Sequence, residues 1–225
     1  MKPIVQGVLL IDKPAGRSSF SLIPALRRLC SEKKIGHAGT LDPFATGLMI
    51  YLIGKTYTRQ AQGFSSEDKE YEMLVHLGKV TTTQDPEGEV ISSCDVQPTL
   101  KQIEEAIETF QGESFQTPPM FSAKKQNGKR LYELAREGKE VERAPCTVHM
   151  KIELLSYEYP YLKLKVSCSK GTYMRSLAHD LGQKLAIGAY ALELRRTRIG
   201  AFRLEEALSW QKVQESFDPQ FIKEL

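Results

Sequence analysis

The stretch TVHMKIELLSYEYPYLKLKVSC, residues 147–168, decides the fold class of this chain of 225 residues. Two runs of alternating apolar and polar residues, 147–154 and 162–168, flank a turn signal at Tyr159-Pro160. Alternation with a period of two is typical of strands that bury one face and expose the other. We therefore expect these runs to form an antiparallel pair of strands with one polar face.

Other strands and helices are expected on both sides of this pair, in an irregular order. The capping-box signature of Thr99 and Gln102 opens a helix whose predicted apolar face is Leu100, Ile103, Ile107 and Phe110. The apolar run 48–53 fits either a buried strand or a short helix. The remaining expected elements are strands at 7–12, 71–77 and 192–199 and helices at 18–30 and 172–185. Because strands and helices mix without regular strand–helix–strand alternation, the class is α+β.

Composition excludes some classes of protein. Hydrophobic residues make up 41% and charged residues 26%, as in globular proteins with an ordinary core. No apolar run is long enough to span a bilayer, and the short run before Asp12 lacks a signal-peptide cleavage site. The four cysteines (Cys30, Cys94, Cys146, Cys168) form no CxxC pair. We therefore expect no disulfide, no zinc site and a cytoplasmic location.

Charge is distributed unevenly along the chain, although the net charge is only +3. Residues 163–203 hold nine basic and two acidic residues, whereas residues 66–119 hold twelve acidic residues and three lysines. Segregation of this kind fits a basic face that is offered to a polyanion such as nucleic acid. It equally fits two oppositely charged surfaces without a partner.

The segment GHAGTLDPFATG, residues 36–47, holds a single acid, Asp42, among glycines, threonines and a proline. Its glycines allow a tight backbone path and the close approach of a partner, and Pro43 disfavours helix at Asp42. A lone carboxylate on such a path suits a nucleophile or a base. The alternative is a loop with an Asx-type turn at Asp42.

Five separated motifs resemble those of the TruB family of tRNA pseudouridine synthases, in the order of that family. Residues 36–49 resemble the catalytic motif, with Asp42 at the position of the catalytic aspartate. Residues 7–19, GVLLIDKPAGRSS, resemble the N-terminal motif, in which Lys13 is expected to have a mainly structural role. The third motif is Lys69-Glu70-Tyr71, and the fourth is SCSKGTYMR at residues 167–175, which LELRR at residues 192–196 completes. The fifth is the basic stretch of about residues 117–145.

The resemblance implies roles for individual residues. Tyr71 would stack on the target uracil, Leu194 would pack against it, and Arg175 would pair with Asp42 and favour its ionised form. His37 would act as a wedge in the RNA loop. Lys170 and Tyr173 stand where the 167–175 motif enters a helix, expected from Thr172, whose amides suit an anion. Without the resemblance, an ordinary strand tyrosine, a surface arginine and a turn histidine remain the alternatives.

A basic stretch of about residues 117–145 resembles the mobile insertion that closes over the tRNA T arm in this family. It begins at a proline pair, Pro118-Pro119, and includes Lys124 and Arg130 among its cations. Such side chains mostly contact phosphates, which positions RNA without reading its sequence. A solvated loop is the alternative for any one of these lysines.

Taken together, the resemblance implies a pseudouridine synthase fold with a mixed, mainly antiparallel sheet flanked by helices. It implies isomerisation of a T-loop uridine of tRNA, conventionally numbered 55, to pseudouridine, with Asp42 as nucleophile and the base flipped out. No metal or organic cofactor is expected. We expect residues 1–225 to form one catalytic domain, acting as a monomer, without the C-terminal PUA domain of many members.

Two other classes of function stay open at this point. A non-catalytic tRNA-binding or folding module would keep the basic face and would not need Asp42, Tyr71 and Arg175. A nucleoside hydrolase is disfavoured because glycoside hydrolysis normally uses two carboxylates and the catalytic motif offers one.

Overall fold

The computed structural model describes residues 6–126 and 128–224 and contains two compact units. The first unit comprises residues up to Tyr71 together with those from Leu194 onward, and the second comprises Glu72–Glu193. The chain passes from one unit to the other within two strands, β4 (Lys69–Leu77) and β12 (Ala189–Ile199).

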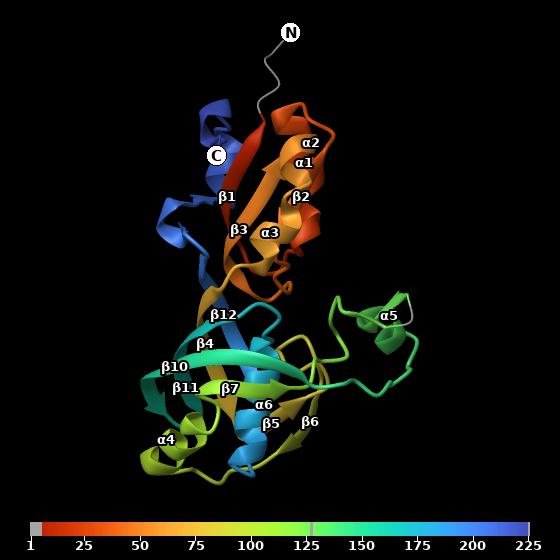
Figure 1. Ribbon diagram of the computed structural model, residues 1–225. Coiled ribbons are helices and arrows are strands. Elements are labelled where there is room, and N and C mark those ends of the chain that lie inside the picture. The colour runs from red at the N-terminus through yellow and green to blue at the C-terminus, as the bar shows by residue number, and fades with distance from the viewer. Residues whose placement is uncertain (1–5, 127, 225) are drawn as a thin grey trace. The chain divides into compact units, whose positions relative to one another are not determined.

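The first unit is built on β3 (Thr46–Ile53), which has neighbours on both edges (Figure 1). β1 (Gly7–Lys13) pairs with it antiparallel along its whole length, from Gly7 opposite Ile53 to Lys13 opposite Gly47. β2 (Ile35–Ala38) pairs antiparallel with β3, and the end of β12 pairs parallel with its start. The short strands β13 (Phe202–Arg203) and β14 (Leu208–Ser209) lie on β12 and β1.

Burial explains why the apolar run 48–53 is a strand. Leu48, Met49, Ile50 and Leu52 are all fully buried, so both faces of β3 are covered and its sequence does not alternate. On one face, Leu48, Ile50 and Leu52 join a core cluster with residues of β1, Ala38 and Ile199. The helices of this unit are α1 (Ile23–Cys30), α2 (Lys55–Thr58), α3 (Ala61–Ser66) and α7 (Trp210–Glu215), with 3-10 turns at Ser19–Leu22, Leu204–Glu206 and Pro219–Phe221.

The second unit contains the strand pair that the sequence predicts. β10 (Cys146–Glu158) and β11 (Tyr161–Cys168) are antiparallel, from Met150 opposite Cys168 to Glu158 opposite Tyr161. Every second residue from Leu162 to Cys168 is buried. The strand order is β4-β11-β10-β7, where β7 is Gly112–Gln116, and a separate small sheet pairs β5 (Lys79–Thr81) with β6 (Val90–Ser93). The predicted α+β class with a mainly antiparallel sheet is confirmed.

Two helices of the second unit, α4 (Leu100–Glu108) and α6 (Met174–Lys184), pack against each other. The predicted capping box of α4 is present at Thr99, but Leu100 is 51% exposed and does not belong to the apolar face. The helix α6 begins two residues later than predicted, since the hydroxyl of Thr172 donates to the Ser169 carbonyl and Tyr173 is the N-cap residue.

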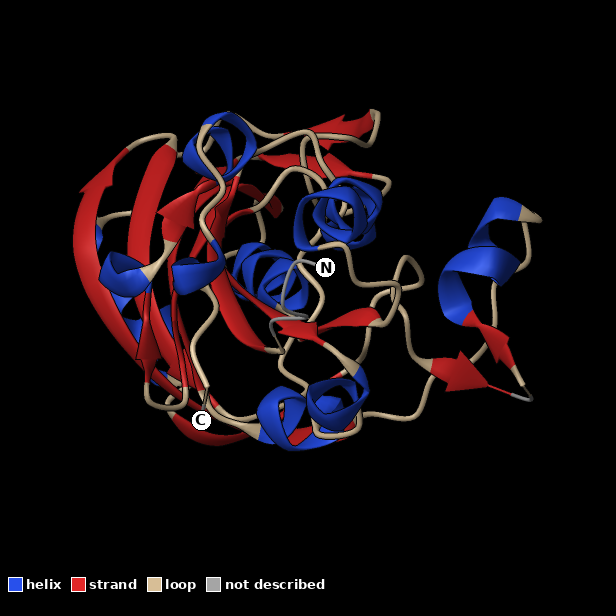
Figure 2. Ribbon diagram, turned by 90° about the horizontal axis from the view of Figure 1, so that it is seen from above, coloured by secondary structure: helices blue, strands red, loops and turns tan. Residues whose placement is uncertain are grey.

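The basic stretch of about residues 117–145 forms a small hairpin and a helix. The hairpin strands are β8 (Lys125–Gln126) and β9 (Lys129–Arg130), and α5 (Leu131–Arg136) follows directly. Figure 2 shows the hairpin and α5 standing out from the rest of the second unit. Asn127, within this hairpin, lies outside the described residues.

Two glycines in helices allow a paired test of the packing. A Cβ at Gly182 in α6 would lie 2.2 Å from the backbone nitrogen of Ala189, whereas a Cβ at Gly63 in α3 would meet nothing within 4 Å. We expect Gly182→Ala to lower the free energy of unfolding by about 1–3 kcal/mol through overpacking. Gly63→Ala should raise it by roughly 0.5–1 kcal/mol. Chemical denaturation measures both, and equal effects of the two substitutions would contradict this packing.

Candidate active site and comparison with known proteins

Asp42 lies in the turn 39–45 between β2 and β3. It is half-buried, and its neighbours Leu41 and Ala45 are fully buried. The Asp42 carbonyl accepts a hydrogen bond from the Ala45 amide at 3.2 Å, and the next carbonyl, of Pro43, accepts one from Gly16 at 2.8 Å. The carboxylate therefore stands on a tight turn that the core anchors on both sides.

Lys13 ties this turn to the N-terminal motif. Its side chain is completely buried, and its ammonium donates to the carbonyls of Pro14 at 2.8 Å, Arg17 at 2.6 Å and Pro43 at 3.2 Å. A buried ammonium needs such acceptors, because desolvation without them is very costly. The predicted structural role of Lys13 is confirmed. Its ammonium binds the carbonyl of Pro43, the residue that follows Asp42.

Ser19 holds the backbone immediately before Asp42. Its hydroxyl donates to the Leu41 carbonyl at 3.0 Å and accepts from the Leu41 amide at 2.8 Å. The phenol of Tyr51 donates to the Ser19 carbonyl at 2.8 Å. Burial raises the pKa of Tyr51, so this phenol stays protonated and remains a donor.

Arg196 spans both ends of the turn from within the core. It is 1% exposed, and its guanidinium donates to the carbonyls of Gly39 and Leu48, each at 2.8 Å. Gly47 packs against the Arg196 backbone so closely that a Cβ there would lie 2.3 Å from the Arg196 carbonyl oxygen. Gly39 and Gly47 also have φ angles of +68° and +105°. The glycines predicted that a partner packs closely against this segment. In the structure, that partner is β12 of the same chain.

Three further predicted site residues belong to the first unit. His37 lies on β2, with its ring edge-on to Tyr51 at 6.2 Å between centroids. Burial and then the charge of Arg196 lower the pKa of His37, so the ring is neutral at pH 7. Leu194 is buried, and its carbonyl accepts the hydroxyl of Thr46 at 3.4 Å, which joins it to the end of the Asp42 turn. Tyr71 is 6% exposed on β4.

Arg175 belongs to the second unit and is buried near the start of α6. Its guanidinium donates to the carbonyls of Thr83 at 3.0 Å and Phe121 at 2.6 Å, and it lies 3.6 Å from the Asp85 carboxylate. The sequence patterns did not single out Asp85, so this buried partner was missed. The pairing of Arg175 with Asp42 joins residues of the two units and stays a prediction.

Tyr173 and Lys170 flank the start of α6. The side-chain amide of Gln116 accepts from the Tyr173 amide at 2.7 Å and donates to the Tyr173 carbonyl at 2.9 Å. This buried glutamine, which sequence reasoning also missed, fixes the backbone where the predicted motif enters the helix. Lys170 is exposed on the preceding turn.

Lys124 and Arg130 are exposed residues of the basic stretch. The ammonium of Lys124 lies 2.9 Å from the Cys146 sulfur. The guanidinium of Arg130 donates to the Tyr132 hydroxyl at 2.6 Å, and Arg130 and Arg136 both lie within 6 Å of the Tyr132 ring centre. These cations are accessible to a polyanion.

The described residues contain no group of three or more His, Cys, Asp or Glu side chains that could hold a metal ion. All four cysteines are free thiols. Among the helices of residues 6–126 and 128–224, none is both long and apolar enough to cross a membrane.

Comparison with known proteins decides the family. The model of the N-terminal domain of TruB family pseudouridylate synthases matches residues 27–174, which is more than half of the chain. The chain belongs to the TruB family. The model of the tRNA pseudouridylate synthase B C-terminal domain matches residues 175–222 of this family member. Asp42 and Tyr71 therefore lie in the first matched region, and Arg175 and Leu194 in the second.

Relatives of this family member match over most of their length. The tRNA pseudouridine synthase B of Protochlamydia amoebophila is 56% identical over 209 residues, which are 93% of this chain and 80% of the relative. The corresponding protein of Opitutus terrae is 47% identical, over 98% of this chain and 92% of the relative. The motif-based assignment to the family, and to an RNA-modifying isomerase, is confirmed.

Solved structures confirm the fold of this TruB-family chain. A chain in the crystal structure of a Cbf5-Nop10-Gar1 complex is 27% identical with a TM-score of 0.76, covering 98% of this chain. A chain in an H/ACA RNP bound to a substrate RNA containing 2'-deoxyuridine is 26% identical with a TM-score of 0.70, covering 95%. The present chain spans only 60% and 54% of those two chains.

The position of Arg196 predicts that a conservative substitution there lowers the rate of catalysis. In Arg196→Lys, a shorter side chain with one ammonium replaces a planar fork whose Nε and Nη2 bind the Leu48 and Gly39 carbonyls separately, so we expect at least one of these bonds to be lost. We expect kcat for pseudouridine formation to fall about tenfold or more, with a smaller change in KM, since the turn loses a bond to a charged group.

Arg198→Lys is the matched control, because the Arg198 side chain is half-buried and donates to the Gly200 carbonyl away from the turn. It should keep near-normal kcat. An Arg196→Lys protein with unchanged kcat would show that Arg196 does not position the turn.

Proposed function

We propose that this chain isomerises a uridine in the T loop of tRNA, conventionally numbered 55, to pseudouridine, with Asp42 as the nucleophile. The observation that carries the proposal is the placement of Asp42 on a turn that Lys13, Ser19 and Arg196 hold through its backbone. Such a rigid support keeps a reacting carboxylate in one geometry. The relatives named tRNA pseudouridine synthase B support tRNA as the substrate.

The chemistry needs one carboxylate and no added reactant. Breaking the bond between the uracil N1 and the ribose C1′ builds positive charge at C1′, which the Asp42 carboxylate stabilises or captures. The detached base rotates, and its C5 bonds to C1′ while Asp42 is released. C5 then loses its proton to the solvent, and N1, freed from C1′, takes up a proton. Atoms balance because substrate and product are isomers. Hydrolysis would instead require a positioned water and normally a second carboxylate.

The other predicted residues have roles around this step. We infer that Tyr71 and Leu194 hold the base during rotation, since both are buried side chains suited to pack on a ring. Arg175, which Asp85, Thr83 and Phe121 hold in the second unit, would supply the cation that balances the Asp42 carboxylate. These assignments rest on the motif positions.

Binding of tRNA must offset the cost of flipping the base, which is a few kcal/mol. We assign this to the exposed cations of the stretch 117–145, with Lys124 and Arg130 on phosphates of the T arm, and to Lys170 and Tyr173. His37, whose ring is neutral, would fill the space that the flipped base leaves. We further propose that the chain acts on tRNA as a monomer in the cytoplasm.

Tritium release tests the reaction. A T-arm RNA with tritium at uridine C5 should release tritium without free uracil, and Asp42→Asn should lower the rate by at least about 10³-fold, as for loss of a nucleophile. Asp95→Asn, at an exposed position of the second unit, is the control and should keep normal activity.

The same assay separates the other classes of function. Free uracil would identify a nucleoside hydrolase, and tight binding without release of tritium or uracil would identify a tRNA-binding module. Full activity of Asp42→Asn would contradict the assignment of the nucleophile.

Salt dependence tests the role of the basic stretch. Replacing Lys124, Lys125, Lys129 and Arg130 with glutamine should raise the Kd for tRNA at least about tenfold near 0.1 M salt. It should also flatten the dependence of log Kd on log salt, by roughly 0.7–0.9 for each phosphate that the protein no longer neutralises. Glutamine at Lys101, Lys151, Lys212 and Lys223, which are exposed outside this stretch, should change both much less. If both sets of substitutions changed the Kd for tRNA and its salt dependence equally, binding would depend on net charge alone and not on the basic stretch.

A further inference from the structure

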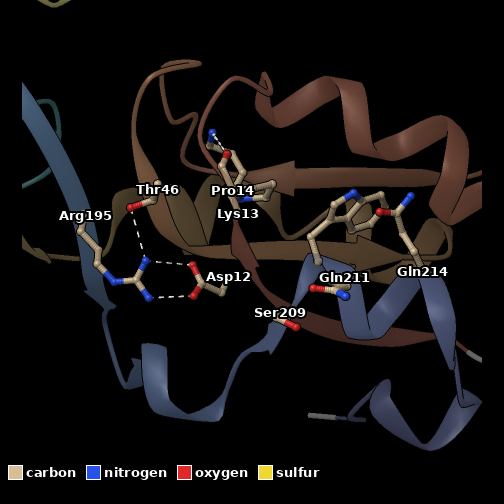
Figure 3. A pocket seen from close by; sticks show the side chains of 9 residues that line it. Asp12, Lys13, Pro14, Thr46, Arg195, Ser209, Gln211 and Gln214 are labelled. Atoms are coloured by element: carbon tan, nitrogen blue, oxygen red, sulfur yellow. Dashed lines mark hydrogen bonds and ion pairs between the residues drawn. The ribbon is translucent and has the colours of Figure 1, made fainter.

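A pocket of about 290 Å³ lies in the first unit, and its lining includes Lys13 but not Asp42. It is formed where β1 and β12 meet the start of β3 and α7, and its lining includes Asp12, Thr46, Arg195, Ser209, Trp210 and Gln214 (Figure 3). Successive side chains of a strand point to opposite faces. Arg195 therefore points away from the face that Leu194 and Arg196 share.

An ion pair stands on one side of this pocket. The guanidinium of Arg195 lies 2.7 Å and 3.2 Å from the two Asp12 carboxylate oxygens and 3.3 Å from the Thr46 hydroxyl. The bidentate geometry fixes the plane of the guanidinium. The Arg195 side chain is still 43% exposed. Lys13 also lines the pocket, but its ammonium is buried against backbone carbonyls, so Arg195 is the cation that this pocket exposes.

A buried donor without an acceptor stands in the same lining. Trp210 is 7% exposed, and its indole Nε1 has no hydrogen-bond partner among the described residues. Burying a donor without an acceptor costs on the order of 1–3 kcal/mol of folding free energy. A ligand that offers this donor an acceptor would therefore gain binding free energy. Gln214 of α7 lies on the side of the pocket opposite the ion pair (Figure 3).

We propose that this pocket binds one nucleotide. A base carbonyl accepts from Trp210 Nε1, the base ring packs on the indole and Pro14, and the phosphate binds the open edge of Arg195. The volume is at the lower end of the range for ligand pockets, which fits one nucleotide and no more. The nucleotide comes either from an unpaired position of tRNA or from free nucleoside monophosphate. The site does not use Asp42, so it can be tested whether or not the chain isomerises uridine.

Trp210 is the only tryptophan of the chain, so its fluorescence reports on the pocket alone. Titration with UMP, CMP, AMP and GMP should give a saturable change for at least one of them, with the matching nucleoside binding about tenfold more weakly. Arg195→Gln should weaken the monophosphate about tenfold or more and abolish this difference, because a charge-assisted bond is removed. Asp42→Asn should leave the titration unchanged.

Full-length tRNA and a T-arm hairpin distinguish the two sources. A tRNA source predicts that full-length tRNA changes the fluorescence and competes with the monophosphate, whereas a free-nucleotide source predicts binding without such competition. If Arg195→Gln does not fold, Trp210→Phe followed by calorimetry should weaken binding about fivefold, because one hydrogen bond is removed. The proposal is overturned if neither monophosphates nor tRNA alter Trp210 fluorescence, or if both variants bind as the parent chain does.

Discussion

The buried guanidinium of Arg196 is the interaction on which the geometry of the first unit depends. It is held in the core by carbonyls at both ends of the Asp42 turn. Removing a cation from water is costly unless acceptors surround it, so the turn and the guanidinium can only be buried together. Because Leu194 and Arg196 lie on the same strand, the position of Asp42 and that of the side chain proposed to hold the base are set by one element.

Hydrogen bonds to the backbone support the turn that carries Asp42. Lys13, Ser19 and Arg196 bind main-chain groups on both sides of Asp42, and Leu41 and Ala45 anchor it in the core. A catalytic group gains precision when its supports are rigid elements of the scaffold rather than a mobile loop. In this turn the glycines are necessary as well, because Arg196 leaves no space for a Cβ at Gly47. The residues of this motif are therefore needed for packing as well as for chemistry.

The sequence patterns predicted those elements whose structure depends on residues close together in the chain. The alternation at 147–168 was sufficient because each strand buries one face, but the run 48–53 stayed ambiguous because both of its faces are buried. The start of α6 was misplaced since its backbone is fixed by Gln116, 57 residues away in the chain. Asp85 was missed because its partner Arg175 is also distant in sequence. Arg196 was included among the basic residues of 163–203 that fit a basic surface. Its position two residues after the apolar Leu194 in an expected strand instead places it on the buried face.

The alignment of β1 with β3 has an electrostatic consequence. At the end of β1, the ammonium of Lys13 enters a nest of three carbonyl oxygens, while the neighbouring Asp12 meets Arg195 on the other face. A slip of one residue would exchange the two faces, placing a carboxylate among carbonyl oxygens and a second cation beside Arg195. The first exchange would bury a carboxylate against the negative ends of carbonyl dipoles, and the second would place two cations side by side. Misaligned pairings of β1 with β3 are thus penalised twice, so the lysine helps to select one strand pairing during folding as well as supporting the turn afterwards.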